Sequence, residues 1–291
     1  MKHKSLVLML TAFFLAALLI YYYSSKSVQE PGRESLAREP ISFLNAPPRP
    51  ENSLSGSEFA AFSRNLTRKQ RQTAVMRELQ RGNIPDFLRT FVPVAMESVR
   101  NGDTLRAIIR VAPDYLSIGA NQNFIRIPLS YQTAAAIAEN FGCALPTQKM
   151  ADAVCRQAEV KLTSPAPALV PFRNEGTLYQ DLQRKEQKLA RTFPRGRLAA
   201  GHRRDLIVAG RSWNVLKHAA LYSGCPDQEP AVRLVYLFDG QFPDHAAGVR
   251  LVSSRVLVNG REMDIRELRR DSSLARVLAY EGPLRKTRKN I

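Results

Sequence analysis

The first 27 residues constrain this chain more than any other stretch. They read "MKHKSLVLMLTAFFLAALLIYYYSSKS", in which Lys2 and Lys4 precede an uncharged run of 18 residues from Leu6 to Tyr23. A run of this length lies at the lower limit for a helix that spans a bilayer. The leading lysines favour a cytoplasmic N-terminus, and the three tyrosines at the end suit the membrane interface. We therefore expect residues 1–27 to be a membrane-targeting segment and the rest of the chain to lie outside the cytoplasm.

The sequence leaves open whether this segment is cleaved. Only Ser25-Lys26-Ser27 resembles a cleavage site, and the bulky Tyr21, Tyr22 and Tyr23 precede it. An uncleaved signal anchor would make the chain a single-pass protein of the inner (cytoplasmic) membrane, through residues 6–23. Cleavage would release a secreted protein. Both alternatives place the body in the periplasm or cell envelope.

The remainder divides into a linker and one body. Residues 28–57 are rich in Pro, Ser and Glu, which predicts a disordered tether. Residues 58–291 mix helical and strand periodicities, which predicts an α+β (mixed α/β) globular domain with a mixed sheet and flanking helices. The prolines of "TSPAPALVPFRNEG" indicate a possible hinge at 163–176. Helices are expected at about 58–80, 130–140 and 147–157 and from about 264; strands at about 104–111, 115–119, 124–127, 205–210, 218–222, 232–238 and 248–258.

The chain is strongly basic, with 43 basic and 26 acidic residues and a formal net charge of +17. Between Arg195 and Lys217 there are six basic residues and one acidic residue. An exported protein meets anionic wall polymers and acidic lipid surfaces before it meets nucleic acid, and both attract cations. We therefore expect an anionic wall polymer or acidic lipid as partner and no nucleic acid. The alternative is a solvated basic surface without a specific ligand.

The three cysteines Cys143, Cys155 and Cys225 bear on the redox compartment. Outside the cytoplasm they allow at most one disulfide and leave one thiol, and the sequence does not say which two join.

Common catalytic signatures are absent from the sequence: there is no G-x-S-x-G elbow, P-loop, H-E-x-x-H pair or dinucleotide fingerprint. What remains is His202 in "AGHRRDLIVAG", Cys225 in "YSGCPD" and Asp244-His245 in "FPDHAAGVRLV". A Cys225 thiolate with His202 or His245 as base is a conceivable acyl-transfer pair, although a structural thiol or disulfide is the commoner role. No metal ion and no cofactor are expected.

Four segments carry a resemblance to known sequences. They are "YLSIGANQNFIRIPLSYQTAAAIAENFGCALPTQKMADAVC", "AGHRRDLIVAG", "AGVRLV" and "VLVNGREMDIRELRRDSSLARVLAYEGPL", in this order. Over about residues 110–283 the chain resembles an uncharacterised family of exported bacterial proteins. Because the family has no established reaction, the resemblance implies a fold and a compartment rather than an activity.

Several polar positions of that family are replaced here. Similar proteins carry aspartates where this chain has Ala120-Asn121-Gln122-Asn123, and Ser-His-Gly where it has Ala246-Ala247-Gly248. Gln241 and Cys225 also stand at histidine positions. The positions that look retained are His202, Asp205, Asp244 and Arg250. The resemblance thus implies the loss of carboxylate ligands for a hard cation and of nucleophile and base groups, unless the family's polar cluster is itself structural.

Two functions remain open at this stage. The sequence favours a non-catalytic, degenerate member of a hydrolase-like family, a pseudoenzyme that binds an anionic wall polymer, a lipid or a protein partner. The alternative is a cell-envelope hydrolase that uses His202, Asp205 and possibly Cys225. The candidate site residues are His202, Asp205, Cys225, Asp244 and Arg250, and the question is whether they converge.

Overall fold

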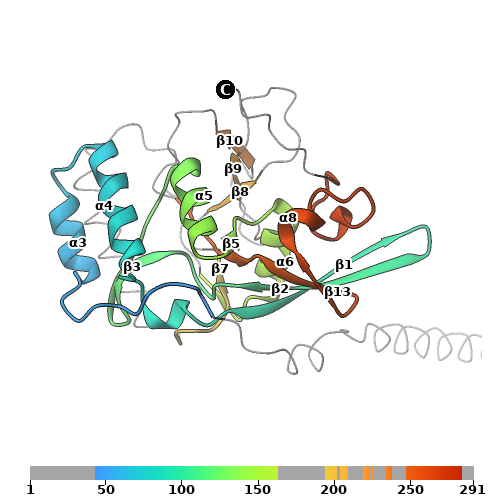
Figure 1. Ribbon diagram of the computed structural model, residues 1–291, viewed down its shortest axis with the longest axis horizontal. Coiled ribbons are helices and arrows are strands. Elements are labelled where there is room, and N and C mark those ends of the chain that lie inside the picture. Colours follow the sequence, from blue (N-terminus) through green and yellow to red (C-terminus); the bar gives the residue numbers. More distant parts are fainter. Residues whose placement is uncertain are drawn as a thin grey trace, which may run out of the picture. The chain divides into compact units, whose positions relative to one another are not determined.

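The computed structural model describes residues 43–162, 194–201, 204–208, 219–222, 225, 234–237 and 247–283. All of them belong to the second of two compact units, which begins at Pro40. This unit combines helices with several sheets, so the α+β expectation is confirmed (Figure 1). The expected hinge, His202 and Asp244 lie outside the described residues.

Within the described ranges, no helix has the length and apolarity needed to cross a bilayer. The run from Leu6 to Tyr23 lies outside those ranges. The membrane segment therefore stays a prediction from the sequence.

The larger sheet is antiparallel and has the strand order β14-β13-β2-β12-β5, with β1 paired to β2. Asn-Gly turns at Asn101-Gly102 and Asn259-Gly260 close its two hairpins, and all four residues have positive φ, as such tight turns require. Its strands are β1 (Val92–Arg100), β2 (Asp103–Val111), β5 (Cys143–Ala144), β12 (Val252–Ser253), β13 (Arg255–Val258) and β14 (Arg261–Asp264).

A second sheet has the order β10-β9-β8-β11, and its strands are β8 (Arg204–Val208), β9 (Ala219–Tyr222), β10 (Leu234–Leu237) and β11 (Ala247–Gly248). It is mixed, because β11 runs parallel to β8 and places Gly248 opposite Asp205. Two small sheets pair β3 (Ser117–Ala120) with β4 (Asn123–Arg126), and β6 (Val160–Lys161) with β7 (Ala199–Ala200).

The helices begin where side-chain caps allow. Ser130 and Thr147 accept hydrogen bonds from the backbone N–H groups of Thr133 and Met150, which confirms two of the expected helices. The helical elements are α3 (Gly56–Ser63), α4 (Arg68–Gln80), η1 (Asp86–Leu88), α5 (Tyr131–Asn140), α6 (Gln148–Gln157), α8 (Ile265–Leu268) and η2 (Ala275–Val277).

The expected single helix over 58–80 is wrong, since the structure has two helices there. Thr67 breaks the run because its side chain and that of Gln70 form a capping box, which starts α4. Arg71 of α4 then donates to the carbonyl oxygens of Ser63 and Leu66 and so holds the connecting turn.

The body also begins earlier than Glu58. Leu44 is buried, and its N–H donates to the carbonyl oxygen of Arg89. Arg49 donates to the side-chain oxygen of Asn83 at 3.0 Å. Residues 43–57 therefore pack on the body, and the expected linker ends before Phe43.

Strand β1 is not predicted by the sequence analysis. It is an edge strand in the described part of the sheet, and Pro93 is tolerated there because an edge position does not need its N–H. The side chain of Gln157 contacts the outer edge: its oxygen accepts from Ala95 N at 2.9 Å, and its nitrogen donates to Ala95 O at 2.8 Å. A helix side chain thus takes the place of a neighbouring strand at Ala95.

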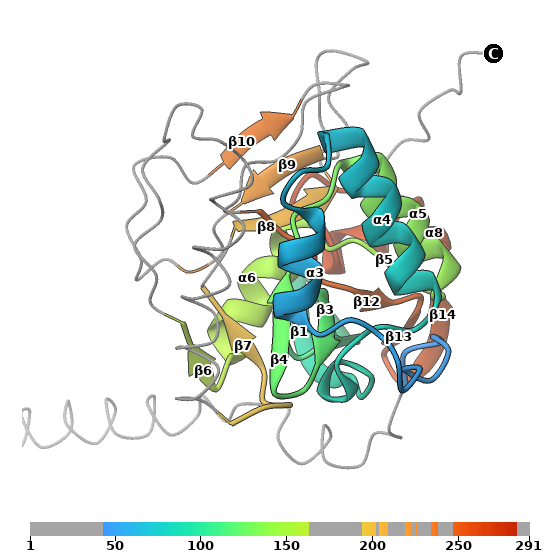
Figure 2. The same cartoon turned by 90° about the vertical axis from the view of Figure 1, so that its left-hand side faces the viewer.

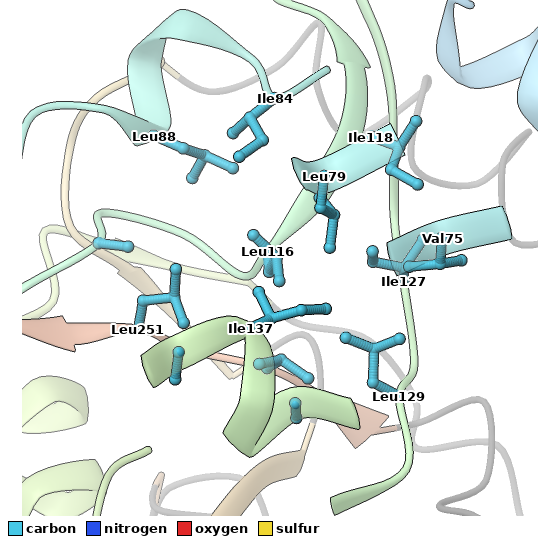
Figure 3. Close-up of a cluster of buried hydrophobic side chains, with 14 of the residues drawn as sticks. Val75, Leu79, Ile84, Leu88, Leu116, Ile118, Ile127, Leu129, Ile137 and Leu251 are labelled. Carbon is cyan, nitrogen blue, oxygen red and sulfur yellow. The ribbon is translucent and has the colours of Figure 1, made fainter. Parts of the chain in front are cut away.

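Two apolar clusters form the core. The first lies among α3, α4, α5 and the β3–β4 pair, and Figure 3 shows Val75 and Leu79 of α4 together with Ile118, Ile127 and Leu129. The second lies between the large sheet and α6, α8 and η2. The chain from Ala247 to Ser253 passes from one cluster to the other, since Ala247, Val249 and Leu251 belong to the first and Val252 to the second.

Candidate functional site

The segment between β11 and β12 positions Arg250. Ala112 N donates to Leu251 O at 2.9 Å, and Leu116 N donates to Val249 O at 2.7 Å. Successive side chains of an extended segment point to opposite sides. Because Val249 and Leu251 pack in the first apolar cluster, Arg250 faces the other way.

The guanidinium group of Arg250 joins three segments. It donates to the carbonyl oxygens of Ala112 at 2.9 Å and Ala199 at 2.7 Å. Its Nε lies 3.5 Å from Oδ1 of Asp205, and its Cζ lies 4.5 Å from the centre of the Tyr115 ring. The side chain is 0% exposed. Arg250 is therefore a buried cation that links the chain before β3, strand β7 and strand β8.

Asp205 makes long contacts, of 3.5 Å, with Tyr115 and Arg250. It is 5% exposed; its Oδ2 is 3.5 Å from the hydroxyl of Tyr115, and its Oδ1 accepts no hydrogen bond from the described residues. Burial raises the pKa of Asp205 to about 6, although the charge of Arg250 opposes this shift. Burial, and then the charge of Asp205, also raise the pKa of the Tyr115 phenol.

A second buried ion pair lies next to Tyr115 in sequence. Arg126 donates from Nε and Nη2 to the two oxygens of Asp114, at 2.9 and 2.6 Å. Asp114 Oδ1 also accepts from Tyr115 N at 2.6 Å. We refer to Asp114, Tyr115, Arg126, Asp205 and Arg250 together as the buried ionic cluster.

Gly248 lies directly against this cluster. A Cβ atom built at Gly248 would lie 2.5 Å from Cδ1 of Tyr115, well inside contact distance. Ala247 before it is 0% exposed and packs in the first apolar cluster. Gly248 thus leaves space for the Tyr115 ring, and Ala247 fills apolar space.

The described part of the site is closed to a substrate. Tyr115 and Arg250 are both 0% exposed. A cavity beside Asp114 and Arg126 has a volume of about 30 Å³. That is room for about two waters, whereas ligand pockets measure roughly 300–1,000 Å³. In the described ranges no three His, Cys, Asp or Glu residues form a group that could hold a metal ion.

The expected site residues converge only in part. Asp205 and Arg250 contact each other, whereas His202 and Asp244 lie outside the described residues, as do the other three histidines, His3, His218 and His245.

Cys225 has the structural role that the sequence analysis gave as the commoner one, and not the role of a nucleophile. It forms a disulfide with Cys155, with their Cα atoms 5.4 Å apart, so its sulfur is not the free thiol that a nucleophile requires. Cys143 is the remaining thiol; burial raises its pKa to about 12, which keeps it protonated and unreactive.

The amides of the "GANQNF" stretch have structural roles. Asn123 accepts from Ser57 N at 3.0 Å and donates to Ser57 Oγ at 2.7 Å, which fixes the start of α3. Asn121 accepts from Phe87 N and donates to Asp86, so it holds η1. These contacts agree with the alternative that polar groups at these positions serve structure.

Asp114, Tyr115 and Arg126 are not among the residues expected from the sequence. The sequence does contain a sign that Arg126 is buried and paired, because it is the one charged residue in the apolar strand pattern "FIRI". A charged side chain in a buried strand needs a partner, and Asp114 is the one that the fold supplies.

The raised pKa of Asp205 predicts a pH-dependent stability. Folding shifts the carboxyl pKa from 3.8 to about 6, so its contribution to stability is full below about pH 4 and is lost as the pH rises through about 6. Relative to an Asp205→Asn variant, the native chain should lose about 3 kcal/mol of unfolding free energy over this interval. Urea unfolding of both proteins between pH 4 and 7 measures the difference. Parallel profiles for the two proteins would contradict a shifted Asp205.

Comparison of the chain with models of protein families, with curated proteins and with solved structures finds no match in any of the three.

Proposed function

We propose that this chain is a membrane-anchored protein of the cell envelope, whose extracytoplasmic body binds an anionic component of the envelope and has no catalytic role. The N-terminal apolar run supplies the anchor, and the basic body supplies the binding surface. The function is that of a tethered binding module.

The Cys155–Cys225 disulfide is the observation that carries the proposal. Its two cysteines are 70 residues apart in sequence, and both sulfurs are buried. Structural disulfides persist in oxidising compartments and are rare in the cytosol of mesophiles. The disulfide therefore supports the side of the membrane that the lysines before Leu6 indicate.

The charge balance supports an anionic partner. The net charge of the chain is +17. The buried Arg126 and Arg250 are not available to a partner, because each lies next to a carboxylate inside the body. The expected basic run from Arg195 to Lys217 is described only in part. Of its residues, Arg197 pairs with Glu159 and Arg195 donates to Gln122.

The closed ionic cluster supports a non-catalytic role. Asp205 and Arg250 face each other rather than solvent, and Cys225 is oxidised. The hydrolase alternative thereby loses the thiol among its three candidate groups. No specific observation favours it over the binding module.

Thiol trapping in cells tests the compartment. Cells are quenched in acid, and the denatured full-length chain is treated with a polyethylene-glycol maleimide with and without prior reduction. We expect one modified cysteine, Cys143, without reduction and three after it, in the membrane fraction. Three reactive thiols without reduction, or recovery in the cytosol, would contradict the proposal.

Binding is tested with the detergent-solubilised full chain on isolated cell-wall sacculi and on vesicles of anionic lipid. Exposed charges are screened beyond about 8 Å at physiological salt, so retention on at least one of the two should fall steeply between about 0.05 and 0.5 M salt. Retention that does not change with salt would exclude a charge-based partner.

A further inference from the structure

The elbow between α3 and α4 combines an exposed aromatic ring with basic side chains. Phe62, at the end of α3, is 55% exposed, although its ring lies 6.3 Å from that of the buried Phe59. The exposed basic residues next to it are Arg64 in the turn and Arg68 and Lys69 at the start of α4. We call Phe62, Arg64, Arg68 and Lys69 the elbow face.

The charge of this region is one-sided. From Arg64 to Arg81 the chain contains six basic residues and one acidic residue, Glu78. Glu78 accepts from the amide of Asn83, at the opposite end of α4 from the elbow. Glu58, one turn before Phe62, is occupied at the helix start, where Ser55 donates to it from N and from Oγ at 2.7 Å each. Both carboxylates are thus hydrogen-bonded to other groups, and Glu78 lies at the far end of α4.

We propose that the elbow face docks on the anionic headgroups of the membrane in which the chain is anchored, with Phe62 inserted at the interface. The proposal rests on the proposed function and names its partner as an acidic lipid surface. Basic residues next to an anionic leaflet are attracted to it, and aromatic side chains are favoured at the headgroup level. A wall polymer would satisfy the charges but would offer no apolar layer to Phe62.

The length of chain before the body makes this contact available. The 19 residues from Ser24 to Ser42 separate the end of the apolar run from the first described residue. Even fully extended they span at most about 65 Å, so the body stays close to the bilayer. A tethered surface meets its lipid at high effective concentration, and a shallow contact is then sufficient.

The experiment uses the full-length protein in lipid vesicles. Asn65, exposed in the elbow turn, is replaced by cysteine (N65C) and labelled with a nitrobenzoxadiazole fluorophore under native conditions, in which Cys143 is buried. Vesicles contain either neutral phosphatidylcholine or about 30% anionic phosphatidylglycerol. We expect a blue-shifted, brighter signal in the anionic vesicles only, and its loss at high salt.

A charge-reversed pair gives the test its specificity. In an Arg64→Glu/Lys69→Glu background, the ratio of docked to undocked protein should fall by at least roughly 25-fold. Each lost basic residue removes about a fivefold contribution at an anionic surface, and the introduced carboxylates add repulsion. The matched control is Arg261→Glu/Arg270→Glu, which makes the same charge change at exposed positions on and beside β14 and α8, away from α3 and α4 (Figures 1 and 2). Thermal unfolding of both variants checks that the fold is kept.

The outcomes separate the two proposals. An equal signal in neutral vesicles, or an equal loss in the control pair, would overturn the elbow face as the docking site. If the label does not respond but the chain binds sacculi in a salt-dependent way, the partner is the wall polymer, and only this inference fails. If neither lipid nor sacculi bind the chain, the proposed function fails with it.

Discussion

An Arg250→Met variant should lose about 3–5 kcal/mol of unfolding free energy, which is the usual cost of removing one partner from a buried ion pair. Methionine keeps most of the volume but leaves Asp205 without its cation and the carbonyl oxygens of Ala112 and Ala199 without their donor. Buried polar groups that lose their partners are the main source of such losses. Denaturant unfolding of the full-length chain in detergent measures the change.

Two further variants make this prediction specific. Arg255→Met removes an exposed arginine that lies 3.6 Å from Glu262, and it should change the unfolding free energy by about 1 kcal/mol or less. Adding Asp205→Asn to Arg250→Met should restore part of the loss, because the unpaired buried charge is gone. A loss at Arg250 no larger than that at Arg255, or no recovery in the double variant, would show that the buried ionic cluster does not hold the fold together.

Removing the disulfide should have an effect of similar size. The Cys155–Cys225 bond closes a loop with a sequence separation of 70 residues, for which the chain-entropy model gives about 4 kcal/mol. A Cys155→Ser/Cys225→Ser variant should therefore unfold at lower denaturant concentration than the native chain. Native protein treated with reductant should behave like the variant.

The remaining cysteine supplies the control for this experiment. Cys143 is buried and unpaired by a disulfide, so Cys143→Ala should keep the full difference between oxidising and reducing conditions. Stability that is independent of reductant in the native chain would mean that this bond does not restrict the unfolded state.

Local signals in the sequence were sufficient for α5 and α6. Each has a Ser or Thr cap followed by an apolar face, and caps act through bonds to the next few residues, so a single sequence contains all the information needed. The break at Thr67 carries the same kind of signal, but the apolar spacing on both sides continues through it. Strand β1 was not predictable in this way, because its stability comes from pairing with β2 and from Gln157, 62 residues away.

The site could be predicted less completely than the fold. Asp205 and Arg250 are two of the five candidate residues that the sequence suggests, and the structure brings these two together. Their environment depends on Tyr115, which is 90 residues from Asp205 in sequence and has no local feature that marks it as a buried partner. The disulfide partner of Cys225 was equally open, since pairing of cysteines depends on distances that only the folded chain sets.

The contact between Gln157 and β1 has a consequence for self-association. An uncovered strand edge offers unpaired N–H and C=O groups to a second copy of the chain, and growth by strand addition leads to aggregates. Figure 1 shows the β1–β2 hairpin extending beyond the rest of its sheet, where such an edge would be accessible. At Ala95 both backbone groups are already bonded to Gln157, and two residues earlier Pro93 has no N–H to offer. The edge of β1 is thereby blocked at Pro93 and Ala95, so a second copy of the chain cannot add a strand there.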